Sequence, residues 1–360
     1  RGYESINGGA PLVLVDNIPM DLNAMNPDDI ESISVLKDAA AAAIYGARAA
    51  FGVILVTSKK GKAGKLRVNL STEQAASSPI FLIDPVDDPY IYMTDQNYIS
   101  TSQGLAPIYN ASRVVSALAY SQNPSQANVW KVNNGILEYN GFNNYQKKVV
   151  SEMSLQKKYD LSMSGATENA SYYASIGYLG KDGYLVNDSK NQKFERINAL
   201  LKVDFKVNNW LSFDSKISYT NTTNDEPHTY AFDASLNSVG RLSPIEPLEF
   251  PDLAYYLTPG DHDKYAEYIG KGFFNQNSLP YINEGGRDHW TKHDTWFTQG
   301  LTLKPVAGLV IKSDFSYNNF TQYIENVASK VSVVNGLDLK NIAFSYGYSA
   351  NDYIYNQMNY

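Results

Sequence analysis

The 360-residue chain contains no cysteine and no apolar run as long as the roughly 18 residues that mark a transmembrane helix. Without cysteine, the chain forms no disulfide bond and no metal site built on thiolates. Without a long apolar run, it crosses no membrane as a helix. Membrane-spanning β-strands stay open, because their alternating side chains keep the average hydropathy low.

The segment from Pro11 to Gly61 predicts a small α+β unit. A short apolar strand begins at Leu12, and Asp16 and Asn17 tolerate the positive φ that a tight hairpin requires. Asn26 is the expected N-cap of a helical turn, because a proline and two acidic residues follow it.

The second half of this unit predicts a buried strand, a short helix from Ala39 to Tyr45, and a central strand from Gly52 to Thr57. Alanine favours the helix, and β-branched residues favour the central strand. The predicted core of the unit consists of Ile33, Val35, Val53, Ile54 and Val56.

The rest of the chain alternates polar and apolar residues, most clearly at 194–207. There the apolar face consists of Ile197, Ala199, Leu201, Val203, Phe205 and Val207, and the polar face of Arg196, Asn198, Lys202, Asp204 and Lys206. Similar segments are 65–71, 159–164, 171–179, 210–221, 295–303 and 309–317, and an eighth strand is expected near Asp352. Alternation alone fits a membrane barrel and a soluble β-sandwich equally well.

The connections between these segments distinguish the two architectures. Short turns at 166–170, 207–210 and 304–308 alternate with long connections near 75–158, 180–192, 223–292 and 322–351. Outer-membrane barrels have short turns at one end and long loops at the other, whereas a sandwich does not sort its loops in this way. The connections therefore favour a barrel.

The stretch from Thr223 to Trp290 is strongly acidic, with eleven acidic and four basic residues. It is therefore not expected to bind nucleic acid, whose phosphates require basic partners. All four histidines lie in or beside this stretch. Asp261, His262 and Asp263 could form a metal cluster, but a solvated loop is the favoured interpretation, and no metal or cofactor site is predicted.

Three segments resemble one known family. They are PLVLVDNIPM at 11–20, NPDDIESISVLKDAAAAAIYGARAAFGVILVTSKKG at 26–61, and YDLSMSGATENASYYASIGYLGKDGYL at 159–185. In order and spacing they resemble the SusC/RagA family of TonB-dependent outer-membrane transporters, over roughly 11–61 and 158–223. The chain departs from the family at Asn17, where glycine is usual, but asparagine also adopts the left-handed conformation.

The resemblance implies a large antiparallel transmembrane β-barrel with a small α+β plug domain inside it. Residues 1–62 would be the C-terminal part of the plug, and residues 63–360 about the first eight strands of the barrel. Eight strands leave no room for a plug, whereas 22-stranded transporters enclose one. Further strands are therefore expected after Tyr360, and the rest of the plug before Arg1.

The resemblance further implies TonB-dependent active import of a nutrient, either an oligosaccharide or an oligopeptide. The expected partners are a SusD-like surface lipoprotein, TonB with ExbB and ExbD, and lipid of the outer membrane of a Gram-negative, Bacteroidetes-like bacterium. Enzymatic activity is not expected, because neither a Ser/His/Asp arrangement nor a glycosidase carboxylate pair has supporting context. The alternatives are a passive porin and a soluble glycan-binding β-sandwich.

Four residues are candidates for substrate contact. Arg48 could face a ligand or interact with a carboxylate of the plug. Tyr255, Tyr256 and Trp290 could stack on sugar rings, or they could pack the acidic loop together. The sequence does not decide between these roles, and no catalytic residue is predicted.

Overall fold

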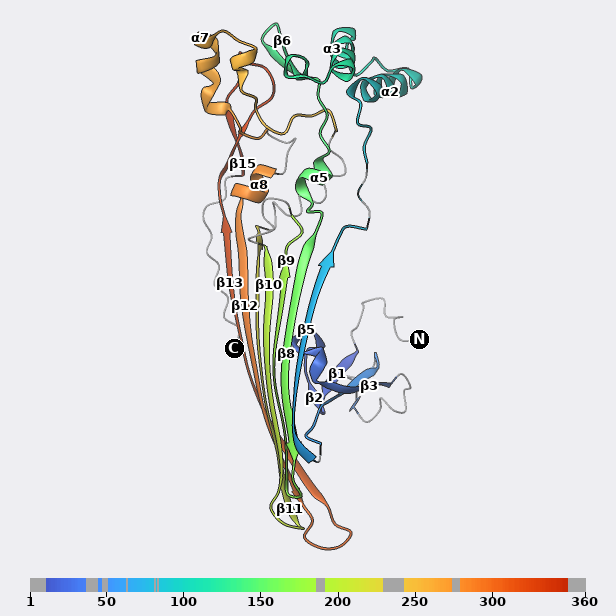
Figure 1. The fold of residues 1–360 in the computed structure, drawn as a ribbon, viewed down its shortest axis with the longest axis vertical. Helices are drawn as coiled ribbons and strands as arrows, with labels where there is room; N and C mark the ends of the chain where they lie inside the picture. Colours follow the sequence, from blue (N-terminus) through green and yellow to red (C-terminus); the bar gives the residue numbers. More distant parts are fainter. Residues whose placement is uncertain are drawn as a thin grey trace.

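The computed structural model describes residues 11–36, 45–46, 51–62, 64–80, 82, 84–185, 192–228, 243–273 and 279–348. The structure has three parts. A small N-terminal domain lies beside a long sheet, and a group of helices and hairpins lies at the upper end of that sheet (Figure 1). Of the predicted helix from Ala39 to Tyr45, residues 39–44 lie outside the described residues, as does the predicted strand near Asp352.

The N-terminal domain is a four-stranded sheet in the order β2-β1-β4-β3. Its strands are β1 (Leu12–Val15), β2 (Ile18–Pro19), β3 (Ile30–Leu36) and β4 (Val53–Ser58). The predicted hairpin is confirmed, because Asp16 and Asn17 have φ angles of 49° and 69°. The predicted cap is also confirmed: two 3-10 turns follow β2, η1 (Leu22–Ala24) and η2 (Pro27–Asp29), and Asn26 caps the second.

The core of this domain differs from the prediction. Val53 and Val56 are buried, with 0% and 2% exposure, but Ile33 and Val35 are 52% and 54% exposed. Both belong to β3, which stands at the end of the strand order and pairs with β4. The other buried apolar residues are Leu14 and Val15 of β1, the parallel neighbour of β4, and Ile18 of β2. Sequence pattern identifies the strand but does not show that it lies at an edge.

The long sheet has seven strands in the described part of the chain, in the order β13-β12-β11-β10-β9-β8-β5, and all neighbours are antiparallel. They are β5 (Gly64–Ser77), β8 (Ser154–Ala166), β9 (Ala170–Asp182), β10 (Lys193–Lys206), β11 (Leu211–Pro227), β12 (Gly286–Leu303) and β13 (Ile311–Ala328). The links at 167–169, 207–210 and 304–310 are short, and the others longer. The predicted sorting of connections is therefore confirmed.

Several strands extend further than predicted. β11 continues to Pro227 and β12 begins at Gly286, so that His289, Trp290 and His293 lie in a strand and not in a loop. The prediction was wrong here because residues 222–227 and 286–294 are largely polar on both faces. A strand with two polar faces shows no hydrophobic period.

The long connections are folded and not irregular. The first contains α2 (Pro89–Ser102), α3 (Ala111–Gln122), α4 (Gln126–Val129), β6 (Trp130–Asn133), β7 (Ile136–Tyr139) and α5 (Tyr145–Val149). The later ones contain η4 (Leu253–Tyr255), α7 (Pro259–His262), η5 (Asp263–Tyr268), α8 (Leu279–Glu284), β14 (Val331–Val334) and β15 (Phe344–Tyr348). Within the described ranges, none of the helices has the length and apolar character needed to cross a membrane.

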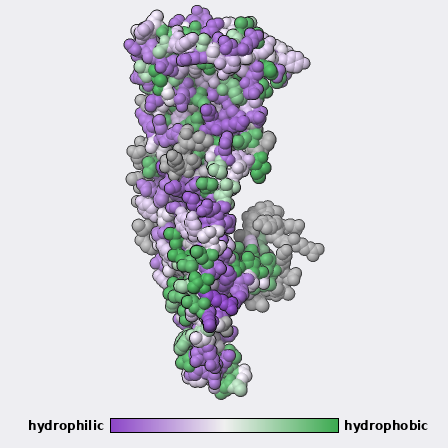
Figure 2. Space-filling view, in the orientation of Figure 1, coloured by the Kyte–Doolittle hydropathy of each residue, from purple (hydrophilic) through white to green (hydrophobic). Residues whose placement is uncertain are grey.

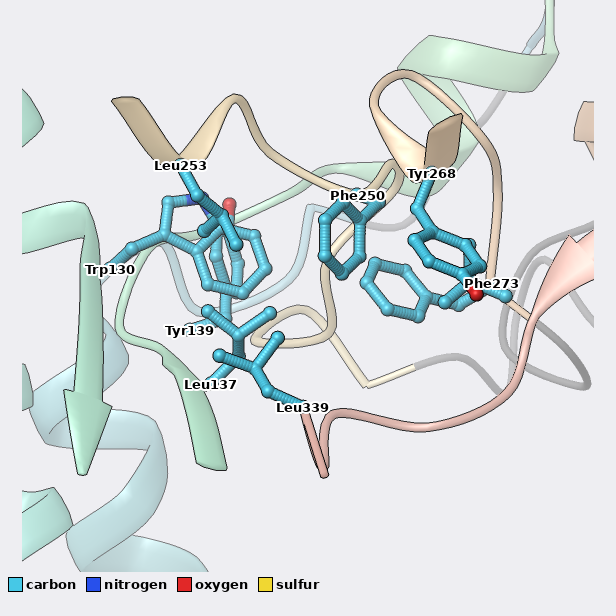
Figure 3. Packing of buried hydrophobic residues seen from close by; sticks show 9 residues of the cluster. Trp130, Leu137, Tyr139, Phe250, Leu253, Tyr268, Phe273 and Leu339 are labelled. Carbon is cyan, nitrogen blue, oxygen red and sulfur yellow. The ribbon is translucent and has the colours of Figure 1, made fainter. Parts of the chain in front are cut away.

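Three of these connections contribute to one large apolar core, while smaller apolar clusters join α5 with α8 and α2 with α3; we call this part of the molecule the outer subdomain (Figure 3). The core residues are Trp130, Leu137, Tyr139, Phe250, Leu253, Tyr268, Phe273, Val334 and Leu339. Because these residues come from three connections that are far apart in the sequence, no local hydrophobic periodicity predicts that they form a core. This part was predicted to consist of loops, and its core was not predicted.

Candidate functional site between the N-terminal domain and the sheet

The two faces of the long sheet are reversed relative to those of a soluble protein. Lys202 and Lys216, on the face toward the N-terminal domain, are each 7% exposed, whereas Leu201 on the opposite face is 44% exposed. Soluble proteins bury apolar side chains and rarely bury a lysine. The predicted division of residues 194–207 into two faces is confirmed. Apolar side chains gather over the lower half of the sheet, and the upper part is largely hydrophilic (Figure 2).

Asp16, in the β1-β2 turn, is the centre of the contact. Its Oδ2 lies 2.8 Å from Lys216 Nζ and 3.3 Å from Lys202 Nζ. Ser58, at the end of β4, donates to the same carboxylate from its backbone nitrogen at 3.0 Å and from its hydroxyl at 2.6 Å. Lys202 also donates to Ser58 Oγ at 2.7 Å. One turn of the domain is thereby bound to two strands of the sheet.

This environment fixes the charge of Asp16. Burial acts to raise the pKa of its carboxyl, but Lys216 and Lys202 outweigh burial and hold that pKa well below its usual range. A carboxylate with a lowered folded-state pKa contributes stability above its unfolded pKa, about 3.9, and loses it only as the pH falls toward the folded value. The contact therefore persists through the whole neutral and mildly acidic range.

A second contact surrounds the cap of η2. Asn26 accepts the backbone N–H of Asp28 at 3.1 Å and donates from Nδ2 to Asp160 Oδ1 of β8 at 2.7 Å. Lys158 of β8 pairs with Asp28 and lies 3.4 Å from Asp160 Oδ2. Gly177 of β9 makes this approach possible, because a Cβ there would lie 2.5 Å from Asn26 Nδ2.

Between these two contacts the sheet binds the backbone of the domain. The carbonyl oxygen of Ala24 accepts from Asn198 Nδ2 at 2.7 Å and from Thr220 Oγ1 at 2.9 Å. Tyr173 donates its hydroxyl to Asp29 Oδ1 at 2.8 Å. The interface is thus polar, is partly charged, and joins residues that are 130 or more positions apart.

Asp29 should behave in the opposite way to Asp16 on titration. Burial raises its pKa, so that its ionised form lowers stability as the pH rises through the folded-state value. We expect Asp29→Asn to remove this pH dependence with little loss of stability at pH 7, since the asparagine oxygen still accepts the Tyr173 hydroxyl. Denaturant midpoints of the refolded full-length protein at pH 5 and pH 8 measure both effects. A large loss at both values would mean that the interface requires the charge.

The predicted substrate residues are divided between parts of the molecule. Arg48 lies outside the described residues. Tyr255 and Tyr256 lie together in the outer subdomain, with ring centroids 5.3 Å apart, and the Tyr256 hydroxyl donates to the carbonyl of Gln126. Trp290 lies in β12, where Lys292 Nζ is 4.6 Å from the centre of its ring. Tyr255 is exposed, whereas Tyr256 packs against the core of the outer subdomain.

The acidic and histidine residues at 252–264 form local pairs. His262 Nε2 lies 2.8 Å from Asp252 Oδ1, and Asp261 pairs with Lys264 at 2.6 Å. In the part of the chain that the structure describes, no group of three histidine, cysteine or carboxylate side chains has an arrangement that could hold a metal.

The interface residues themselves were not identified from the sequence. Lys202 was assigned to the polar face, but its contact with Asp16 depends on a residue 186 positions away. A weak signal was present, because Lys202 and Lys216 lie on the same face of adjacent strands and are register partners. Like charges that face each other destabilise a sheet, so such a pair indicates an acidic partner nearby.

Comparisons with known proteins agree with this architecture. Residues 1–53 match the family model for the TonB-dependent Receptor Plug Domain. TonB-dependent receptor P39 of Formosa agariphila is 24% identical over 340 residues, which are 93% of this chain and 28% of that protein. TonB-dependent receptor SusC of Bacteroides thetaiotaomicron is 46% identical over 76 residues, 18% of this chain and 8% of that protein.

The fold is similar to that of the RagAB peptide importer in its "closed-closed" state, with a TM-score of 0.62 and 21% identity over 89% of this chain and 35% of that one. The chain spans just over a quarter of the length of the curated relatives that it matches over most of its own length. The plug-domain match, the relatives and the fold converge on one assignment. The chain belongs to the SusC/RagA-type family of TonB-dependent receptors.

Proposed function

We propose that this chain is part of an outer-membrane importer. Residues 1–62 form part of the plug, and residues 63–360 form the first part of a barrel wall that closes with about 22 strands in the full protein. The N-terminal domain lies against the polar face of the sheet, which is the face that becomes the lumen on closure. A barrel of about eight strands is filled by its own side chains, so a wider one is needed to hold such a domain.

The observation that supports this function best is the reversal of the two faces of the sheet. The exposed outward face requires an apolar surrounding, which lipid provides, and the polar inward face is covered by the plug. A soluble glycan-binding sandwich would bury the apolar face. A passive porin has a water-filled lumen and no folded domain attached to the wall by buried ion pairs.

The buried ion pairs also indicate why transport needs energy. Opening the lumen requires breaking the ion pairs of Asp16 with Lys202 and Lys216 and the hydrogen bonds around them while they are still buried. We propose that TonB, energised by ExbB and ExbD at the inner membrane, supplies this work. The protein would then reside in the outer membrane of a Gram-negative bacterium.

The cargo proposed is an oligopeptide or an oligosaccharide, and the proposed partner is a SusD-like surface lipoprotein. One structural neighbour is described as a peptide importer, and one relative is SusC. Tyr255 is the best placed of the candidate contacts, because it is exposed on the outer subdomain. Arg48, Tyr256 and Trp290 remain candidates for substrate contact. The proposed role is transport without catalysis.

The proposal predicts that uptake depends on TonB. In the native organism, deletion of TonB or collapse of the inner-membrane proton gradient should abolish uptake of the cargo, while surface binding persists. Radiolabelled candidate peptides and oligosaccharides measure both quantities in parallel. A strain that lacks only the transporter gives the background level. Uptake at the full rate without TonB would contradict the proposal and support the passive porin.

A further inference from the structure

The short turns at the lower end of the sheet differ in polarity. The β8-β9 turn consists of Thr167, Glu168 and Asn169, all polar and exposed. The β12-β13 turn at 304–310 instead exposes Val306 (63%), Leu309 and Val310. The β10-β11 turn exposes Trp210 (50%), and the backbone carbonyl of Trp210 accepts the N–H of Lys304, so these two turns are adjacent. Exposed apolar side chains in a turn require an explanation.

Strand tilt places the apolar turn at the edge of the lipid-facing surface. In β9 the large outward apolar side chain farthest from the short turns is Tyr178. The strand register places four residues of the next four strands at the same position, Ile197 of β10, Asn221 of β11, His293 of β12 and Thr321 of β13. In β13 the continuous run of outward apolar side chains ends at Tyr317, four residues lower than Thr321, because Asn319 and Thr321 separate it from Tyr323. The apolar band therefore moves down by four residues across four strands.

This displacement is the one that a membrane barrel requires. Strands about 4.8 Å apart and tilted by about 40° change level by roughly one residue per strand, or about four to five residues across four strands. The lower limit of the band moves in the same way. Tyr172 of β9 is in register with Phe315 of β13, so the same shift places Ile311 at the level of Tyr172. The turn at 304–310 directly precedes Ile311 and lies at the lower edge of the band.

We propose that Trp210 and the apolar side chains of the β12-β13 turn contact lipid of the periplasmic leaflet of the outer membrane. Continuity with the outward apolar face supports lipid as the occupant. Trp210 suits the membrane interface, because its ring is apolar and its N–H is polar. Lys304, at the start of the turn, places positive charge where anionic headgroups lie. The inference rests on the membrane location proposed above.

Single-cysteine labelling tests this contact, since the chain itself contains no cysteine. In the full-length protein, freed of any cysteine elsewhere and refolded in phosphatidylcholine vesicles, an environment-sensitive fluorophore is placed at Val306→Cys. We expect blue-shifted emission that is strongly quenched by lipids carrying a nitroxide on the upper acyl chain. The fluorophore at Glu168→Cys, in the polar turn, should emit as in water and resist this quenching. Heat-modifiable migration confirms that each variant is folded.

Two more variants separate the possible outcomes. Leu201→Cys, in the middle of the outward face, should be quenched by nitroxides deep in the acyl chain; if it is not, the membrane location itself is wrong. If Leu201 is quenched but Val306 resembles Glu168, only the present inference is overturned. Blue-shifted emission at Val306 without lipid quenching would identify a protein partner instead. Adding Leu309→Asp and Val310→Asp to the Val306→Cys variant should abolish its quenching.

Discussion

Replacing Asp16 with asparagine is expected to destabilise the docked plug by about 3–5 kcal/mol, the usual effect of removing one partner from a buried ion pair. The variant leaves the ammonium groups of Lys202 and Lys216 buried, side by side, and without their carboxylate. Asparagine still fits the turn, because it tolerates the positive φ found at this position. The loss of stability is therefore caused by removal of the carboxylate charge and not by a change in the hairpin.

Denaturant titration of the full-length protein in lipid, combined with hydrogen exchange at residues 11–20, measures this effect. Glu31→Gln is the matched control: it also removes a plug carboxylate, but its pair with Lys62 is exposed, 3.4 Å long, and should contribute at most about 1 kcal/mol. Adding Lys202→Met and Lys216→Met to the Asp16→Asn variant should restore much of the stability, because no charge is then left buried. Equal effects of Asp16→Asn and Glu31→Gln would mean that the cluster does not hold the plug.

Features that depend on neighbouring residues were predictable from the sequence. The Asp16-Asn17 hairpin and the Asn26 cap follow from a few adjacent side chains, and both are present. The two faces of β10 follow from the period of two. The pairing of β8 with β9, of β10 with β11 and of β12 with β13 follows from the short links, which force sequential strands to pair.

Features that depend on distant residues were not predictable. Alternation indicates a free, lumen-facing side chain for Lys202, but in the structure this lysine is buried against Asp16 and Ser58. Ile33 and Val35 have the composition of a buried strand but lie in a strand at the end of its sheet. The outer subdomain was not predicted for the same reason, since its core combines residues from three separate connections of the chain.

The lipid-facing surface leads to the second large effect. Phe315 and Ser316 are adjacent in β13, and their side chains point to opposite faces of the sheet. Phe315 is on the outward face with its register partner Gln299, and it lies within the outward apolar band. We expect Phe315→Lys to destabilise the full-length protein in lipid by about 2–4 kcal/mol, the range for a lysine near the bilayer midplane.

Ser316→Lys is the matched control, because it adds the same charge at nearly the same depth but on the lumen side, where water or the plug can accept it. Its effect should stay small. Phe315→Leu separates the loss of the aromatic ring from the gain of charge, since leucine keeps the outward side chain apolar. Urea unfolding in phosphatidylcholine vesicles gives all three free energies. If both lysines destabilise the protein equally, the two faces are not distinguished by lipid and the barrel assignment of β13 is wrong. If only Phe315→Lys does so, the exposed face of the sheet is the one that meets the membrane.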